Sequence, residues 1–167
     1  MSESNEYTTH PSSEMVKNSP LGKELTTAQC EALSKIAVVR TLKQGDLLFK
    51  EGDRDATLYV IVKGSLKAVR KTAAGDVVSL YDLYGGEVAG VMGFMDNVGH
   101  SADMQAIREC EVFSLPREDF EALMHQNPEL IYKVMRAVIR TMLSILQRMD
   151  VQFVELTNYI SKQHGRY

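Results

Sequence analysis

Cysteine, basic charge and long apolar runs are all scarce in this chain, and each scarcity excludes a class of protein. Only two cysteines, Cys30 and Cys110, occur in 167 residues. Their separation fits no metal-binding spacing, so we expect two reduced thiols that are buried or half-buried. Asp and Glu number 22 against 19 Lys and Arg, whereas nucleic-acid surfaces cluster Lys and Arg. We therefore expect no direct DNA binding.

Membrane and secretion signals are missing as well. No apolar run reaches the length of a membrane span. Residues 1–20 are polar and lack the apolar segment of a secretory signal. We expect a cytoplasmic protein with no membrane partner.

Recognisable catalytic groups are also absent from the sequence. No nucleophile stands beside a base in a known pattern, and no carboxylate pair or metal cluster is evident. The histidines are scattered, at His10, His100, His125 and His164. We therefore expect no enzyme, no catalytic residue and no metal site.

The remaining composition is that of a globular chain, with 44% hydrophobic and 25% charged residues. A chain of this size can bury a core without staples. We divide it into a disordered tail at 1–20, a domain at 21–127, a long helix at 128–163 and a short tail at 164–167. We place no helix-turn-helix domain after the long helix.

Short β-type runs separated by glycine-containing turns dominate the middle of the chain. The turns include Gly45-Asp46, Gly52-Asp53 and Gly75-Asp76. This pattern predicts an antiparallel β-roll or barrel. Before it, Thr26 and Gln29 form the capping-box pattern of a helix start. The predicted class is therefore α+β, an antiparallel roll with an N-terminal helix and a long C-terminal helix.

The long helix begins at Pro128 and carries two apolar rows. The first row alternates spacings of three and four, at Met135, Val138, Met142, Ile145, Met149, Gln152, Leu156 and Tyr159. The second recurs near every seven residues, at Ile131, Ile139, Leu146, Phe153 and Ile160. One row can pack on the roll and the other on a partner. We expect a homodimer formed through this helix.

A glycine-rich stretch at residues 83–106 has the composition of a ligand-binding loop, LYGGEVAGVMGFMDNVGHSADMQA. Glycine lets backbone N–H groups approach a ligand closely, and a short helix starting near Gly90 would direct its positive end at an anion. The alternative is that these glycines only form turns between strands. Composition alone favours the second interpretation.

Two motifs in that stretch resemble a known family. They are GEVAGVM at residues 86–92 and HSA at residues 100–102. From about Ile36 to Met149 the chain resembles the cyclic nucleotide-binding domain of catabolite activators and protein kinase A regulatory subunits. The family's cassette reads roughly G-D-x-F-G-E-hydrophobic followed by R-[ST]-A. The resemblance implies a regulatory β-roll whose ligand-binding residues are Gly90, Val91, Met92, His100, Ser101 and Ala102.

The chain departs from the family at the two polar positions of the cassette. Aligned without gaps, Val91 replaces the glutamate that holds the ribose hydroxyl, and His100 replaces the arginine that pairs with the phosphate. Losing a buried charge partner costs about 2–5 kcal/mol, and an unmet hydrogen bond adds about 1–3 kcal/mol. Ordinary binding of cyclic AMP or cyclic GMP is therefore not expected.

Other assignments of the site stay open. A gapped alignment gives Glu87 the ribose-binding role, and the family's lid helix would place Thr141 and Ser144 near the ligand. The cofactor is unknown, although a cyclic nucleotide remains possible. We expect a non-catalytic sensor that signals through its C-terminal helix and can have a protein partner. The alternatives are an interaction module with a vestigial pocket, or a sensor of a cyclic dinucleotide or haem, the last using His100 or a cysteine as axial ligand.

Overall fold

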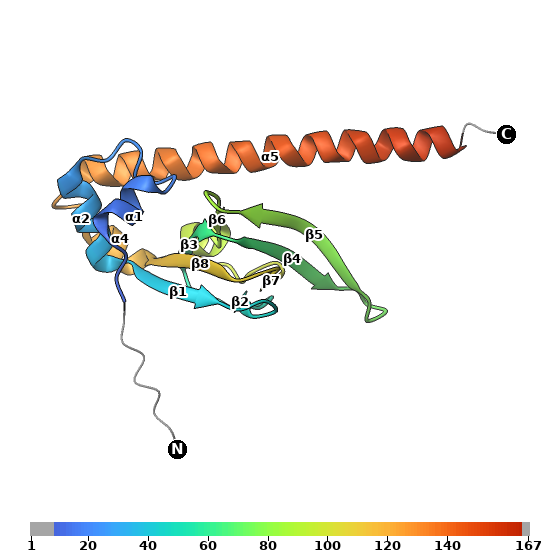
Figure 1. Ribbon diagram of the computed structural model, residues 1–167, viewed down its shortest axis with the longest axis horizontal. Helices are drawn as coiled ribbons and strands as arrows, with labels where there is room; N and C mark the ends of the chain where they lie inside the picture. Colours follow the sequence, from blue (N-terminus) through green and yellow to red (C-terminus); the bar gives the residue numbers. More distant parts are fainter. Residues whose placement is uncertain (1–8, 165–167) are drawn as a thin grey trace, which may run out of the picture.

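The computed structural model describes residues 9–164, and Figure 1 shows a β-roll with helices at one end and one long helix running past it. The helices are α1 (Ser13–Asn18), α2 (Thr27–Ile36), α3 (Val91–Asp96), α4 (Arg117–Ala122) and α5 (Pro128–His164). The strands are β1 (Val38–Leu42), β2 (Leu47–Phe49), β3 (Thr57–Lys63), β4 (Ser65–Lys71), β5 (Val77–Tyr84), β6 (Val88–Ala89), β7 (Asp103–Ala106) and β8 (Cys110–Pro116).

The strands form two four-stranded antiparallel sheets, with orders β1-β8-β3-β6 and β2-β7-β4-β5. The predicted turn at residues 72–76 closes the β4–β5 hairpin, where Lys71 faces Val77. The predicted capping box is also present, because the Thr26 hydroxyl and the Gln29 side chain each bind the other's backbone N–H. The predicted α+β roll with flanking helices is confirmed.

Alternation along β3 divides the core into two clusters. Leu58 and Val60 face the helices and join Phe113 and Phe120, whereas Ile61 faces the opposite sheet. This follows from the period of two in a strand, which sends successive side chains to opposite faces. The sheet containing β3 is therefore covered on both faces, by helices on one and by the second sheet on the other.

The N-terminal segment differs from its prediction. We expected residues 1–20 to be a disordered tail, but α1 occupies Ser13–Asn18, and Val16 and Leu21 have 0% and 1% exposure. Ser12 accepts a hydrogen bond from the Met15 N–H and so caps this helix. The prediction is wrong for this part because two apolar residues suffice to anchor a short polar segment on α2. Residues 1–8, and 165–167 of the predicted C-terminal tail, lie outside the described residues.

Helix α5 uses its two apolar rows differently along its length. Its first half packs on the roll and α2, and Val138 and Ile145 from the first row are buried there. Farther along, the helix extends beyond the roll (Figure 1). Seven of its exposed apolar residues follow alternating spacings of three and four, at Ile139, Met142, Leu146, Met149, Phe153, Leu156 and Ile160. We call these seven residues the α5 seam.

Candidate functional site

A cavity of about 240 Å³ lies between the roll, the α3 loop and α5. Most of its lining is aliphatic, aromatic or thioether. It is lined by Phe49, Tyr81, Leu83, Val88, Ala89, Gly90, Val91, Met92, His100, Ser101, Ala102, Met104, Met142, Ile145 and Met149. Within residues 9–164, no Lys, Arg, Asp or Glu contributes to this lining. The cavity therefore has no permanently charged wall.

Gly90 sets the position of the short helix at one side of the cavity. It caps α3 in the left-handed region, with φ of 77°. A Cβ at this position would lie 2.6 Å from the Thr57 carbonyl oxygen. Glycine is therefore required both by the backbone conformation and by the close approach to β3. The first N–H groups of α3, which have no acceptor within the helix, start at Val91 beside the cavity.

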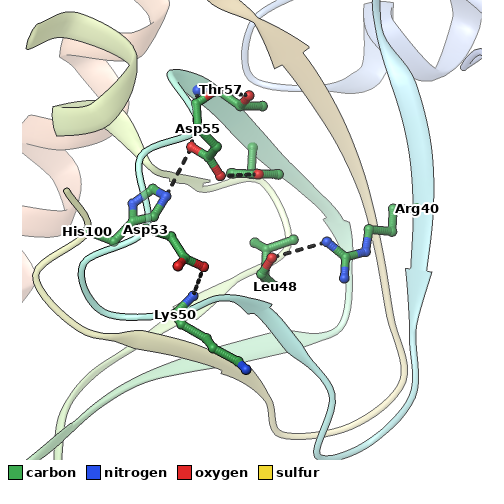
Figure 2. Close-up of polar contacts among 8 residues, drawn as sticks. Arg40, Leu48, Lys50, Asp53, Asp55, Thr57 and His100 are labelled. Atoms are coloured by element: carbon green, nitrogen blue, oxygen red, sulfur yellow. Dashed lines mark hydrogen bonds and ion pairs between the residues drawn. The ribbon is translucent and has the colours of Figure 1, made fainter. Parts of the chain in front are cut away.

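His100 is the one buried polar side chain of the cavity wall, with 4% of its side chain exposed. Its ring stacks on Phe49 with centroids 3.6 Å apart and an interplanar angle of 14°. Its Nε2 lies 3.0 Å from Oδ1 of Asp55, and Figure 2 shows the ring directed at that carboxylate. Stacking and hydrogen bonding together leave this ring one orientation.

Asp55 is itself fixed as a hydrogen-bond acceptor. The Tyr59 hydroxyl donates to its Oδ2 at 2.5 Å, and the Thr57 N–H donates to its Oδ1. Burial, and then the hydrogen bond to Asp55, raise the pKa of Tyr59, so this hydroxyl keeps its proton. Because the carboxylate accepts from both groups, the His100 Nε2 must carry the proton that it shares with Asp55.

Glu87 has a structural partner outside the cavity. Its carboxylate forms a two-pronged ion pair with Arg148 of α5 and accepts the Tyr84 N–H. Arg148 also donates to the Asp82 carbonyl at 2.9 Å, and its guanidinium lies 5.1 Å from the centroid of the Tyr84 ring. The hydrogen bond to Glu87 raises the pKa of Arg148. This cluster ties the end of β5 and the following turn to α5.

The predicted site residues separate into two groups in space. Gly90, Val91, Met92, His100, Ser101 and Ala102 all line the cavity. Glu87, Thr141 and Ser144 are not among its lining residues. Thr141 instead donates its hydroxyl proton to the Ala137 carbonyl within α5, and the positions of α5 that face the cavity are Met142, Ile145 and Met149.

Several residues of the site were not identified from the sequence. Phe49 and Asp55, which hold His100, come from a strand end and a loop far from the glycine-rich stretch. Neither has a motif of its own. Arg148 is also part of the arrangement without any sequence signal, because it is one of several basic residues on α5.

Comparison with known protein families agrees with the class of protein that the β-roll and the glycine-rich loop indicate. Residues 39–127 match the family described as cyclic nucleotide-binding domain. That match covers more than half of the chain, and the chain therefore belongs to the cyclic nucleotide-binding domain family. The predicted resemblance is confirmed.

Two curated relatives are similar to this chain over most of its length. The "Cyclic AMP receptor protein" of Thermus thermophilus is 26% identical over 147 residues, covering 87% of this chain and 68% of the relative. "Neuropathy target esterase sws" of Drosophila willistoni is 31% identical over 135 residues, covering 77% of this chain. The chain spans only 9% of that esterase's length.

A solved structure shares the fold at low identity. The crystal structure of a cyclic nucleotide-binding domain from Methylobacillus flagellatus has a TM-score of 0.77 at 16% identity, covering 86% of this chain and 83% of that one.

Across residues 9–164, no helix is long and apolar enough to cross a bilayer, and no group of three His, Cys, Asp or Glu could hold a metal ion.

Proposed function

We propose that this protein is a non-catalytic regulatory module in which occupancy of the cavity changes the position of α5. The observation that carries the proposal is the double use of two residues. Met142 and Met149 line the cavity and also belong to the α5 seam. A ligand that displaces them therefore alters the surface that a partner of α5 would contact.

The partner of the α5 seam is a second copy of this chain. The seam keeps the four-and-three spacing of a parallel coiled coil from Ile139 to Ile160, and each helix of such a dimer would bury the other's seam. Ile139, Leu146 and Phe153 have 56%, 54% and 70% exposure in the single chain. The dimer would therefore place both cavities beside one central helix pair.

The Arg148–Glu87 ion pair provides the second connection between the ligand site and the helix. Glu87 lies in the turn immediately before β6 and α3, whose residues form the cavity wall. Arg148 lies on α5 between the cavity residue Ile145 and its neighbour Met149. A shift of the α3 loop would move Glu87 relative to Arg148. In the same way, a shift of α5 would move Arg148 and pull on Glu87 and the loop.

The chemistry of the cavity does not favour a cyclic mononucleotide, although the fold and the Thermus relative are of that class. A cyclic phosphate is a permanent anion and is normally matched by arginine. In the gapless alignment His100 takes the place of that arginine, and its Nε2 is already engaged by Asp55. A haem is also disfavoured, because Nε2 of His100 is engaged by Asp55 and the cavity of about 240 Å³ is smaller than the roughly 300–1,000 Å³ common even for drug-sized ligands.

Calorimetric titration of cyclic AMP and cyclic GMP, with a cyclic dinucleotide as a third probe, tests the site directly. The wild type and the variant Val91→Glu/His100→Arg are titrated side by side. We expect no heat from the wild type and binding of a mononucleotide by the variant, because the two changes supply a ribose acceptor and a phosphate cation. Tight binding of a mononucleotide by the wild type would show that the cavity is an ordinary cyclic-nucleotide site.

The same titration addresses the alternative of a pure interaction module. If neither protein binds any nucleotide, the cavity is not a nucleotide site, and binding of another ligand class decides between a sensor and a pure interaction module.

A further inference from the structure

The cavity places one buried imidazole, that of His100, in a mostly apolar space. The polar side chains in its lining are those of Tyr81, His100 and Ser101. Of the two ring nitrogens of His100, Nε2 is bound to Asp55. The other, Nδ1, has no hydrogen-bond partner among residues 9–164, yet no buried side-chain nitrogen or oxygen in that range lacks a partner. Nδ1 is therefore accessible, on a ring that lines the cavity.

The protonation of His100 is linked to Asp55. Because Nε2 holds its proton toward the carboxylate, Nδ1 of the neutral ring is an acceptor. If Nδ1 gains a proton, the imidazolium lies against Asp55 at 3.0 Å and its charge is balanced there. Proton transfer from a bound acid to His100 therefore leaves the net charge of the site unchanged, because the new imidazolium lies between Asp55 and the new carboxylate.

We infer that the cavity binds a small, largely apolar carboxylic acid, with the carboxyl group on Nδ1 of His100 and the hydrocarbon part among the methionines and aliphatic residues. This inference rests on the proposed function and names the ligand class of the same site. The acid proton moves from the carboxyl oxygen to Nδ1, giving a carboxylate–imidazolium pair. No other reactant is needed.

The absence of a permanent charge from the cavity lining favours a carboxylic acid over a permanent anion such as a phosphodiester. A phosphodiester enters as an anion and must be desolvated without a fixed cation in the lining, which is costly. A carboxylate is also ionised in neutral solution, but its pKa of about 4 lets it bind a proton and enter as the neutral acid at a far lower cost than a phosphodiester. Val91 fits this view, because it adds apolar surface where a ribose would require a polar partner.

The size of the cavity limits the hydrocarbon part. About 240 Å³ is below the range of roughly 300–1,000 Å³ common for drug-sized ligands. We therefore select octanoate and 4-phenylbutyrate as probes, each paired with its neutral primary amide. The amides keep the shape of the acids and a carbonyl acceptor beside a hydrogen-bond donor, but they cannot transfer a proton.

The test is isothermal calorimetry on the full chain with these four probes and cyclic AMP. We expect at least one acid to bind and its amide to bind at least tenfold more weakly. His100→Asn should lose at least tenfold of the acid affinity, whereas His125→Asn, which changes an exposed histidine near the start of α5, should keep it. Equal binding of acid and amide, or unchanged binding by His100→Asn, would overturn the inference.

A second variant covers the possibility that His100→Asn fails to fold. Met149→Trp should close the mouth of the cavity from α5, at a position that is partly exposed, and abolish acid binding. Acid binding that survives Met149→Trp lies elsewhere and refutes the assignment.

The failure of the ligand class can be told apart from failure of the proposed function. If no acid binds but Val91→Glu/His100→Arg binds cyclic AMP, the weak-acid inference is wrong and the cavity remains a ligand site. If no probe binds either protein, the inference and the proposed function fall together.

Discussion

Single residues at the cavity are constrained by backbone geometry as much as by side-chain chemistry. Gly90 and Gly86 both have positive φ, at 77° and 89°, but only Gly90 approaches another backbone segment closely. Substitutions at Gly86 and Gly90 can therefore distinguish the cost of the backbone conformation alone from the added cost of a steric contact.

Gly90→Ala is expected to destabilise the fold more than Gly86→Ala. The left-handed conformation alone costs roughly 1–2 kcal/mol for a residue with a Cβ. Gly86→Ala should show that cost only, since no atom lies within 4 Å of its Cβ position. Gly90→Ala adds the contact with the Thr57 carbonyl. Urea denaturation measures both, and equal losses of unfolding free energy would disprove the close approach.

Tyr59 should make stability fall at alkaline pH. Its pKa is raised above the ordinary value of 10, by burial first and by Asp55 second. Because the folded protein binds this proton more tightly than the unfolded chain, the stabilisation is complete below about pH 10 and declines as pH rises further. Tyr59→Phe should be about 0.5–1.5 kcal/mol less stable at pH 7 and should show a shallower alkaline decline.

Tyr132→Phe is the matched control for that titration, because Tyr132 is exposed on α5. Its unfolding free energy should follow the wild type across the whole pH range. A wild-type slope retained in Tyr59→Phe would assign the alkaline loss to another group.

Between elements, the attachment of α5 to the roll depends on one ion pair in particular. Arg148 and Glu87 are 32% and 13% exposed, whereas Arg140 and Glu24 form an ion pair at 52% and 39% exposure. Exposed pairs contribute about 0–1 kcal/mol. The more buried pair, with its added bond to the Asp82 carbonyl, should contribute more.

Arg148→Ala is therefore expected to cost about 1–2 kcal/mol, less than the roughly 2–5 kcal/mol of a fully buried pair because it retains some solvent contact. Arg140→Ala should cost about 0.5 kcal/mol or less. Thermal denaturation compares the stabilities, and hydrogen exchange of residues 142–152 should accelerate in Arg148→Ala only. Acceleration in both variants would show that α5 is held by no specific pair.

The extent to which sequence predicts this protein also differs between elements. The strands and turns follow from period-two alternation and glycine positions, and Thr26 with Gln29 marked the start of α2. Helix α1 could not be predicted, because its polar sequence hides the anchoring role of Val16. The sequence did not show which face of α5 packs on the roll, because both of its rows are apolar. Only the packing of the folded chain decides that Val138 is buried.

Prediction of the site was limited by contacts between distant parts of the chain. The glycine-rich loop pointed to Gly90, Val91 and His100. The partner of His100 is 45 residues away in sequence and that of Glu87 is 61 residues away. Such pairs have no local signature, so their chemistry becomes visible only when the fold brings them together.

At the scale of the whole molecule, the exposed α5 seam should determine oligomeric state. We expect multi-angle light scattering at tens of micromolar to give twice the chain mass of 18.7 kDa. Leu146→Glu/Phe153→Glu should convert the protein to a monomer, because two charges per helix would have to be buried in the seam.

The control for that change is Gln147→Glu/Glu155→Gln, at exposed positions off the seam, which should leave a dimer. A monomeric mass for the wild type would refute assembly through α5 and assign the seam to a different protein.

The length of α5 gives the molecule a lever arm. Its 37 residues amount to about 55 Å of helix, of which about 22 Å follows Met149, at 1.5 Å per residue. A tilt of about 5° at the cavity would then move the far end by about 2 Å, although nothing at the ligand site need shift by more than a fraction of that. A motion too small to detect around His100 would thus be amplified into a displacement large enough to change how the two helices of the proposed dimer meet.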